Sequence, residues 1–305
     1  MDDRPADSMT AQIGTRAALR FGILTLQDAP LPELSQRWRH AEELGFDALY
    51  VADHVGDYRD LKGFWLDGWT ALAYLATETT RIRIGTLVSN PILRHPVLLA
   101  KEAVALDHLS DGRLELGVGS GIAGFDHAAM GVDYWAPAER AARFAEYVEV
   151  LDGVLRSAGG SYRFRGRFFR TEGTPMHPGP VQRPRPPITV GGQSPTALRI
   201  AAALADCWNT HGPFGRSLED VSAITRRQNR RLDELCRANG RDPSELRRSL
   251  LLFDALDAWA SPDAFERMVR TFTDDGVEEF VVVWPPEHRL GLLDHIATHV
   301  IPALR

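Results

Sequence analysis

The stretch that decides the fold runs from Arg81-Ile-Arg-Ile-Gly-Thr-Leu-Val-Ser-Asn-Pro91 to Arg113-Leu-Glu-Leu-Gly-Val-Gly-Ser-Gly121. Residues 82–88 are rich in β-branched and aliphatic side chains, which predicts a buried parallel strand. Pro96 suits the first turn of a helix, and Asp111-Gly112 provides the turn that ends it. A second apolar strand follows. The stretch therefore predicts a βαβ unit whose crossover is long enough for parallel pairing.

The same alternation of strand and helix continues on both sides of this unit. Each expected strand is followed by a segment with helical periodicity, which predicts a (β/α)8 TIM barrel. A doubly wound sheet is the weaker alternative, because no Gly-x-Gly-x-x-Gly follows the first strand. The expected strands are residues 19–26, 46–51, 82–88, 114–118, 187–190, 206–210, 250–253 and 277–283.

An insertion around residues 158–187 interrupts the alternation. Within it, Tyr162-Arg-Phe-Arg-Gly-Arg-Phe-Phe169 alternates like a short β-hairpin. Insertions of this kind often form a lid or a substrate wall, although an excursion without a role fits the sequence equally well.

Composition narrows the class of protein. Lys and Arg number 35 against 41 Asp and Glu, a net charge of −6, so there is no basic surplus for nucleic-acid binding. The two cysteines, Cys207 and Cys236, do not form a disulfide scaffold, which fits a reducing cytoplasm. No apolar run is long enough for a membrane span. Residues 1–18 are acidic and polar at the start, so we expect a flexible extension rather than a signal peptide, followed by a single domain over 19–305.

In a barrel of this kind the active site lies at the C-terminal ends of the strands. His54 is the best acid or base there, because imidazole titrates near neutral pH. Asp53, beside it, is expected to orient or cap rather than react. The residues that follow the strands are Gln27, Asp28, Asp53, His54, Ser89, Asn90, Gly119, Ser120, Gly121, Gly191, Gly192, Gln193, Ser194, Trp208, Asn209, Thr210, His211 and Trp284.

Two glycine-rich segments stand out among these strand ends. Gly117, Gly119 and Gly121 alternate, and the missing Cβ atoms would let a flat group approach the backbone. Gly191-Gly-Gln-Ser194 precedes a helix, where backbone N–H groups and a hydroxyl suit a phosphate. Ordinary turns are the alternative interpretation of both segments.

Two other kinds of site find no support in the pattern. The histidines His54, His95, His127, His177 and His211 lack metal-ligand spacing, so no metal is expected. A serine hydrolase is also unsupported, because there is no Gly-x-Ser-x-Gly elbow.

Several segments together resemble the bacterial luciferase-like monooxygenase superfamily, in order and at matching spacing over residues 21–283. These segments are Val51-Ala-Asp-His54, Trp69-Thr-Ala-Leu72, Arg81-Ile-Arg-Ile-Gly-Thr-Leu-Val88, Arg94-His-Pro96, Ala100-Lys101, Leu106-Asp-His-Leu-Ser-Asp-Gly-Arg-Leu-Glu-Leu-Gly-Val-Gly119 and Ile188-Thr-Val-Gly-Gly192 to Asp206.

The resemblance implies a flavin-type cofactor over the strand ends, either the deazaflavin F420 or FMN. Ser89-Asn90 matches the position where many F420-dependent members have a non-prolyl cis peptide behind the ring. Gly119 and Ser120 match residues near the ring, and Gly191, Gly192 and Ser194 match the phosphate-binding turn. His54 matches a residue near the reacting face.

The subgroup looks most similar to single-component F420-dependent oxidoreductases. Related sugar-phosphate dehydrogenases have a Glu after the strand-end glycines, where this chain has Ile122, which disfavours glucose 6-phosphate as substrate. Phe64, Trp65 and Trp284 suggest a fairly apolar small-molecule substrate. The resemblance also implies a homodimer.

Three functional hypotheses follow. The first is hydride transfer between F420 and the substrate, with His54 near the transferred hydride or donating a proton. The second is an FMNH2-dependent monooxygenase that uses O2 and a separate flavin reductase. The third is a non-catalytic flavin-binding barrel.

Overall fold

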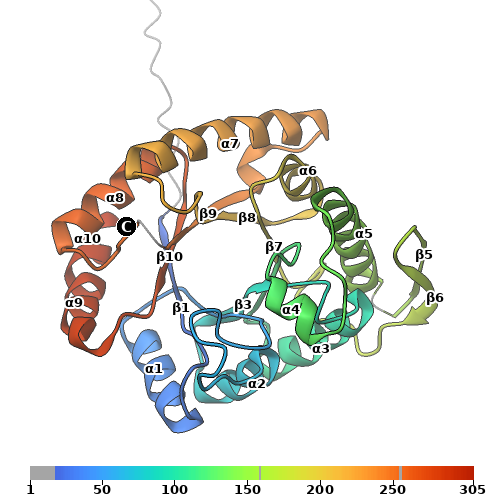
Figure 1. The fold of residues 1–305 in the computed structure, drawn as a ribbon, viewed down its shortest axis with the longest axis horizontal. Helices are drawn as coiled ribbons and strands as arrows, with labels where there is room; N and C mark the ends of the chain where they lie inside the picture. Colours follow the sequence, from blue (N-terminus) through green and yellow to red (C-terminus); the bar gives the residue numbers. More distant parts are fainter. Residues whose placement is uncertain (1–17, 158, 254–255) are drawn as a thin grey trace, which may run out of the picture.

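The computed structural model describes residues 18–157, 159–253 and 256–305. Its centre is a closed barrel of parallel strands, which confirms the (β/α)8 prediction (Figure 1). The barrel closes where Arg20 of the first strand pairs with Glu279 of the last. In their order around the barrel, the strands are β1 (Arg20–Leu24), β2 (Ala48–Val51), β3 (Arg83–Ser89), β4 (Leu114–Val118), β7 (Ile188–Gly191), β8 (Cys207–Thr210), β9 (Arg247–Leu252) and β10 (Glu279–Val283).

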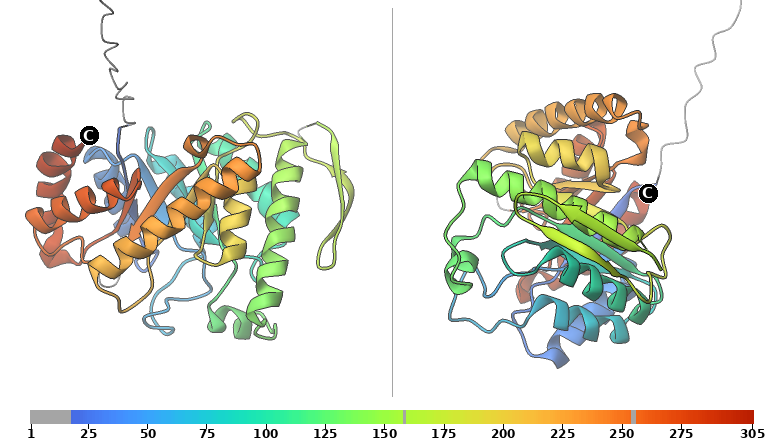
Figure 2. Two further views of the ribbon diagram at one scale, coloured as in Figure 1. Left: turned by 90° about the horizontal axis from the view of Figure 1, so that it is seen from above. Right: turned by 90° about the vertical axis from the view of Figure 1, so that its right-hand side faces the viewer.

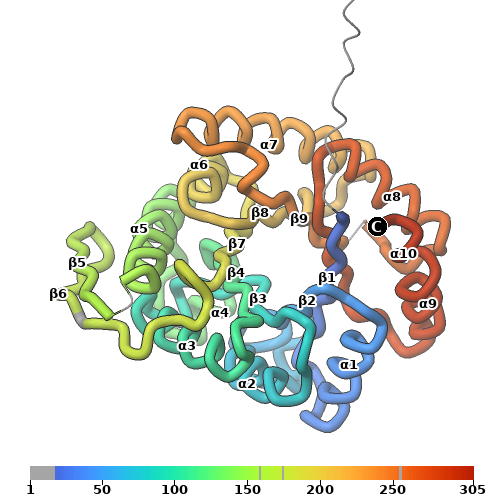
Figure 3. Tube along the Cα trace, turned by 180° about the vertical axis from the view of Figure 1, so that it is seen from behind, coloured from blue at the N-terminus to red at the C-terminus, as the bar shows by residue number. Residues whose placement is uncertain are grey.

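Helices surround the barrel on all sides, as the views from the two ends of the barrel show (Figures 1 and 3). Several begin at side-chain caps: Ser194, Ser217 and Ser261 each accept a hydrogen bond from a first-turn backbone N–H. The helices are α1 (Leu31–Glu43), α2 (Gly68–Glu78), α3 (Pro96–Leu109), α4 (Gly124–Ala129), α5 (Pro137–Arg156), α6 (Pro195–Leu204), α7 (Leu218–Ala238), η1 (Pro243–Glu245), α8 (Pro262–Asp274), η2 (Glu287–Arg289), α9 (Leu290–His295), η3 (Ile296–Val300) and α10 (Ile301–Leu304).

Strand alternation divides the apolar core into two layers. Leu49 and Val51 of β2 belong to the large cluster shared with the helices. Ala48 and Tyr50 of the same strand belong to a small cluster shared with Leu24 of β1. Because successive side chains of a strand point to opposite faces, the small cluster fills the barrel interior.

Charged residues occupy the N-terminal end of that interior. Glu115 is buried and forms ion pairs with Arg20 at 2.9 Å, Arg83 at 2.5 Å and Arg247 at 2.8 Å. Glu279 is also buried and pairs with Arg247 at 3.2 Å. Burial alone would raise the pKa of Glu115, but the arginines outweigh burial and lower that pKa to about 2. We call these five residues the floor cluster.

The floor cluster corrects one predicted strand. The seventh strand was expected at residues 250–253, but β9 begins at Arg247 and ends at Leu252. Its first two residues, Arg247 and Arg248, are charged and do not resemble a buried strand. Glu115 and Glu279 neutralise Arg247, and Asp233 pairs with Arg248 at 2.8 Å.

The insertion forms an antiparallel hairpin, β5 (Ser161–Arg165) and β6 (Arg170–Pro175). The hairpin lies along the outer side of α5, away from the barrel mouth (Figure 2). Glu146 of α5 accepts hydrogen bonds from the backbone N–H groups of Arg167, Phe168 and Phe169 at its turn. The interpretation as a lid or substrate wall is therefore corrected: this hairpin covers the flank of the barrel.

Two further expectations concern the ends of the chain and the membrane. The expected flexible extension, residues 1–18, lies outside the described residues except for its last position. Among the helices of the described part, none is both long enough and apolar enough to cross a membrane.

Candidate active site

The C-terminal ends of the strands, with their loops, form the face of the barrel turned toward the viewer in Figure 1, which we call the mouth. His54 follows β2 at this face, and its Nδ1 lies 2.7 Å from Oδ2 of Asp126 in α4. The other Asp126 oxygen, Oδ1, accepts a hydrogen bond from the backbone N–H of Val55 at 3.0 Å. Asp126 is completely buried, whereas the His54 side chain is 28% exposed.

This geometry orients the imidazole. A carboxylate can only accept, so the neutral ring carries its proton on Nδ1 and leaves Nε2 available to exchange a proton. In the part of the chain that the structure describes, His54 Nε2 has no hydrogen-bond partner. Phe125 lies 5.4 Å from the His54 ring, and Trp65 donates to the His54 carbonyl oxygen at 2.9 Å.

Asp126 is a partner of His54 that the sequence analysis did not identify. It lies 72 positions from His54, and only the fold brings the two together. The available signal was its location in the segment that follows the glycines of the fourth strand, at the same end of the barrel as His54.

Asp53 does not pair with His54. It is buried and pairs with Arg94 at 2.6 Å, and Arg94 also pairs with Asp67 and Glu102. Burial raises the pKa of Asp53, and Arg94 offsets only part of that rise. This arrangement suits an orienting role that joins the ends of β2 and β3.

Ser89 and Asn90 are both buried at the end of β3. Ser89 accepts a hydrogen bond from the Trp69 indole at 2.9 Å. The Asn90 side chain accepts from the backbone N–H of Ile92 and donates to the Asp53 carbonyl oxygen. Their side chains therefore hold the strand end in shape.

The prediction of a cis peptide bond between Ser89 and Asn90 is wrong in its position. The non-prolyl cis bond joins Leu87 and Val88. The pairing of β3 with β4 explains the shift, because its register slips between Thr86 and Ser89 and leaves Leu87 and Val88 in a bulge. Both bulge residues are partly exposed.

The strand-end glycines make room for this bulge. A Cβ on Gly119 would meet Val88 Cγ2 at 2.5 Å, and one on Gly191 would meet Val88 Cγ1 at 3.1 Å. Val88 therefore takes up the space that Cβ atoms on Gly119 and Gly191 would need, and the approach of a flat ligand to these glycines stays a prediction. Ser120, between the glycines, is partly exposed.

Phosphate binding at the turn after β7 stays a prediction, and two of its groups already have partners within the protein. The Gly192 N–H donates a hydrogen bond to the Asn209 carbonyl oxygen. The Ser194 hydroxyl caps α6 by accepting a hydrogen bond from the Ala197 N–H at 3.1 Å. Gly192 has φ +140°, a conformation that favours glycine. Ser194 is exposed, so the N-terminus of α6 remains open to an anion.

Aromatic side chains from three loops stand near one another at the mouth. The ring centroid of Phe253 lies 6.1 Å from that of Tyr58 and 5.9 Å from that of Phe214. His211 lies 4.8 Å from Phe214. Of the three residues expected to make the site apolar, Phe64 is exposed on the same loop as Tyr58, Trp65 packs against the interior cluster, and Trp284 lines a lateral cavity.

No group of three or more His, Cys, Asp or Glu side chains within residues 18–157, 159–253 and 256–305 has a geometry that could hold a metal ion.

Comparison with known proteins agrees with this architecture. The sequence model of the luciferase-like monooxygenase family matches residues 11–291. An F420-dependent glucose-6-phosphate dehydrogenase of Nakamurella multipartita is 26% identical over 95% of this chain and 98% of its own length. A 5,10-methylenetetrahydromethanopterin reductase of Methanopyrus kandleri is 27% identical over 72% of this chain and 64% of its own.

Among solved structures, an F420-dependent secondary alcohol dehydrogenase bound to an F420-acetone adduct superposes with a TM-score of 0.80. The superposition covers 94% of this chain and 99% of that one at 18% identity, and so shows a shared fold. The chain belongs to the luciferase-like monooxygenase family and is an enzyme.

Proposed function

We propose that this enzyme transfers a hydride between F420 and a small, fairly apolar organic substrate. The observation that carries the proposal is the His54–Asp126 pair at the barrel mouth, with Nδ1 held 2.7 Å from a buried carboxylate and Nε2 available for a proton. The glucose-6-phosphate dehydrogenase and the secondary alcohol dehydrogenase, both named as F420-dependent, favour this cofactor.

The residues at the mouth fit a deazaflavin. The partly exposed Leu87–Val88 bulge offers an apolar surface against which a flat ring could pack. The exposed N-terminus of α6 at Ser194 offers a positive end for an anionic group. When bound, F420 would supply or accept the hydride.

The chain's own residues would supply the proton chemistry. For reduction of a substrate, His54 would first take up a proton on Nε2, and this imidazolium would then donate that proton to the atom that becomes negative as the hydride arrives. Asp126 would keep the ring oriented through Nδ1 and stabilise the imidazolium before donation. The aromatic residues Tyr58, Phe214 and Phe253 would exclude water and favour an apolar substrate.

Ile122 narrows the substrate class further. Its side chain is 61% exposed and cannot donate or accept a proton. With His54 as the acid, we expect reduction of unsaturated or imine compounds, and we do not expect oxidation of a sugar phosphate.

The second candidate is an FMNH2-dependent monooxygenase supplied by a separate reductase. The family description itself names monooxygenases, and apolar surroundings would protect an oxygenated flavin from water. A barrel that binds flavin without catalysis is the third candidate, which the ordered His54–Asp126 pair disfavours.

Titration of the purified full chain with F420 and, separately, FMN would distinguish these candidates by quenching of tryptophan fluorescence. We expect micromolar binding of F420 and much weaker binding of FMN. A preference for FMN would replace the proposal with the monooxygenase, and failure of both to bind would leave the non-catalytic barrel. A matched control is Ser217→Ala, which removes the cap of α7 as Ser194→Ala removes that of α6; only Ser194→Ala should weaken binding.

A further inference from the structure

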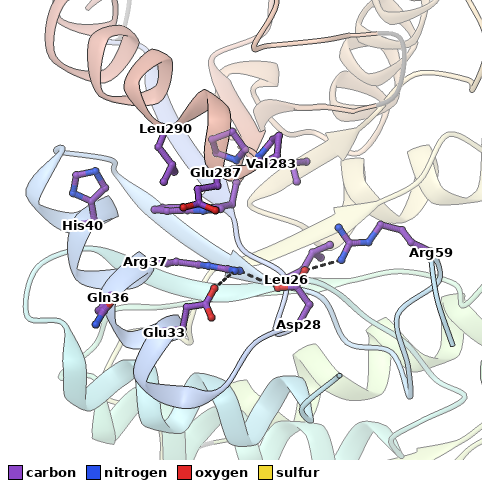
Figure 4. Close-up of a pocket in the computed structure, with 13 residues that line it drawn as sticks. Leu26, Asp28, Glu33, Gln36, Arg37, His40, Arg59, Val283, Glu287 and Leu290 are labelled. Carbon is purple, nitrogen blue, oxygen red and sulfur yellow. Dashed lines mark hydrogen bonds and ion pairs between the residues drawn. The ribbon is translucent and has the colours of Figure 1, made fainter. Parts of the chain in front are cut away.

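A cavity of about 720 Å³ lies to one side of the barrel, between α1 and α9 at the C-terminal ends of β1 and β10 (Figure 4). Its volume falls in the range of sites that bind small molecules. Neither His54 nor Asp126 lines it. The cavity is therefore separate from the pair to which we assign catalysis.

One part of the lining is apolar and firmly held. It consists of Leu26, Val283, Trp284, Pro285 and Leu290. The backbone N–H of Trp284 donates to the Leu24 carbonyl oxygen at 2.8 Å, which fixes the residue to β1. The hydrogen bond holds the backbone, and the Trp284 ring lies edge-on to the His40 ring with their centroids 6.3 Å apart. The indole can stack on a flat apolar group or bind a cation on its face.

The ionisable residues of the lining do not balance. Asp28 forms ion pairs with Arg37 at 2.9 Å and Arg59 at 2.7 Å, and Glu33 forms one with Arg37 at 2.5 Å. These pairs neutralise both arginines. His40, the other ionisable residue of the lining, lies 2.7 Å from Asp294. Glu287 remains: it is exposed, and among the residues that the structure describes it makes no ion pair.

The unbalanced carboxylate faces the cavity beside the apolar part of the lining. Figure 4 draws Glu287 and Leu290 on one side of the cavity and Arg37 with Glu33 on the other. Glu287 also follows Trp284 by only three positions in the chain. A ligand that satisfies this lining carries a positive charge for Glu287 and a flat apolar portion for Trp284.

We infer that this cavity is a second ligand site, which binds a small organic cation with a flat apolar portion, such as an arylalkylamine in its protonated form. The ammonium group pairs with Glu287, and the ring packs against Trp284 and Leu290. Anionic ligands are disfavoured, because both arginines already pair with carboxylates.

The test is isothermal titration of the cofactor-free full chain with three probes of similar shape. Benzylamine is cationic at neutral pH, benzyl alcohol is neutral and benzoate is anionic. We expect benzylamine to bind about tenfold more tightly than benzyl alcohol, and benzoate to bind more weakly than either. Equal affinity for the three probes, or no binding of benzylamine, would overturn the inference.

Variants assign the binding to the cavity. Glu287→Gln should reduce benzylamine affinity about tenfold, to that of benzyl alcohol, and leave benzyl alcohol unaffected. Trp284→Leu should weaken both probes. Glu234→Gln, which changes an exposed glutamate on α7, is the matched control and should change neither.

His54→Asn separates the cavity from the mouth. If this variant loses benzylamine binding, the amine occupies the mouth and the second site is refuted. Because these measurements use no cofactor, their outcome is independent of whether the enzyme uses F420.

Discussion

Replacement of Asp126 by Asn tests the assignment of His54 most directly. The substitution keeps the size of the side chain and can keep one oxygen for the backbone N–H of Val55. The amide NH2 group would then face His54 Nδ1 in place of the carboxylate oxygen that lies 2.7 Å away. Nδ1 would have to accept a hydrogen bond, which moves the ring proton to Nε2.

The geometry sets the size of the effect. A hydrogen bond to a charged partner contributes about 1.5–3 kcal/mol, and Asp126 is fully buried, so solvent does not weaken it. Without the carboxylate, the imidazolium that donates the Nε2 proton loses this stabilisation, which slows donation by a factor of about 10 to 100. We therefore expect the rate of substrate reduction to fall by about the same factor.

Two measurements read this effect. Proton–nitrogen correlation NMR of the imidazole reports the tautomer without any substrate, and should show the proton on Nδ1 in the wild type and on Nε2 in Asp126→Asn. Stopped-flow oxidation of reduced F420 with an unsaturated or imine acceptor reports the rate. Asp133→Asn, an exposed carboxylate beyond α4, is the control. An unchanged tautomer, or a rate within about threefold of the wild type, would refute the reasoning.

Two further predictions concern the interior of the barrel. Glu115→Gln should lower the free energy of unfolding at neutral pH by about 3 kcal/mol, because the folded-state pKa of about 2 lies below the ordinary value of 4.5. That contribution is complete above pH 4.5 and disappears as the pH falls toward 2, and urea unfolding should show it; a midpoint equal to that of the exposed control Glu234→Gln would contradict it. Gly119→Ala would place a Cβ 2.5 Å from Val88, so we expect about 1–3 kcal/mol of destabilisation and weaker F420 binding. Gly291→Ala, where a Cβ would meet nothing within 4 Å, is its control, and equal effects of the two would show that the bulge is not pressed against Gly119.

The sequence predicted the barrel because apolar periodicity is a local signal. The strand expected at residues 114–118 agrees with the structure at both ends, and the helix expected after Ser194 begins at Pro195. The signal failed where a strand begins with charge. Arg247 can lie in a buried strand only because Glu115 and Glu279 arrive from other strands, and no local pattern reports that meeting.

The sequence predicted where in the fold the candidate site lies, but it did not predict the contacts between its side chains. His54 lies at the expected strand end, but its carboxylate partner is Asp126 and not the adjacent Asp53. Consecutive residues of an extended chain point in opposite directions, so adjacency in sequence argued against the pair with Asp53. The cis bond was misplaced by two positions because the bulge depends on the register between β3 and β4, which spacing along one strand does not contain.

The floor cluster has a consequence for how freely this enzyme can be altered. Its five residues come from β1, β3, β4, β9 and β10, so it ties the first strands to the last at the end of the barrel opposite the mouth. The residues that hold the ring of strands shut are thus remote from the loops that carry His54, the aromatic side chains and Ile122. Loops at the mouth can be exchanged, lengthened or randomised to select new substrates, while the closure of the barrel is left to side chains that none of those changes touches.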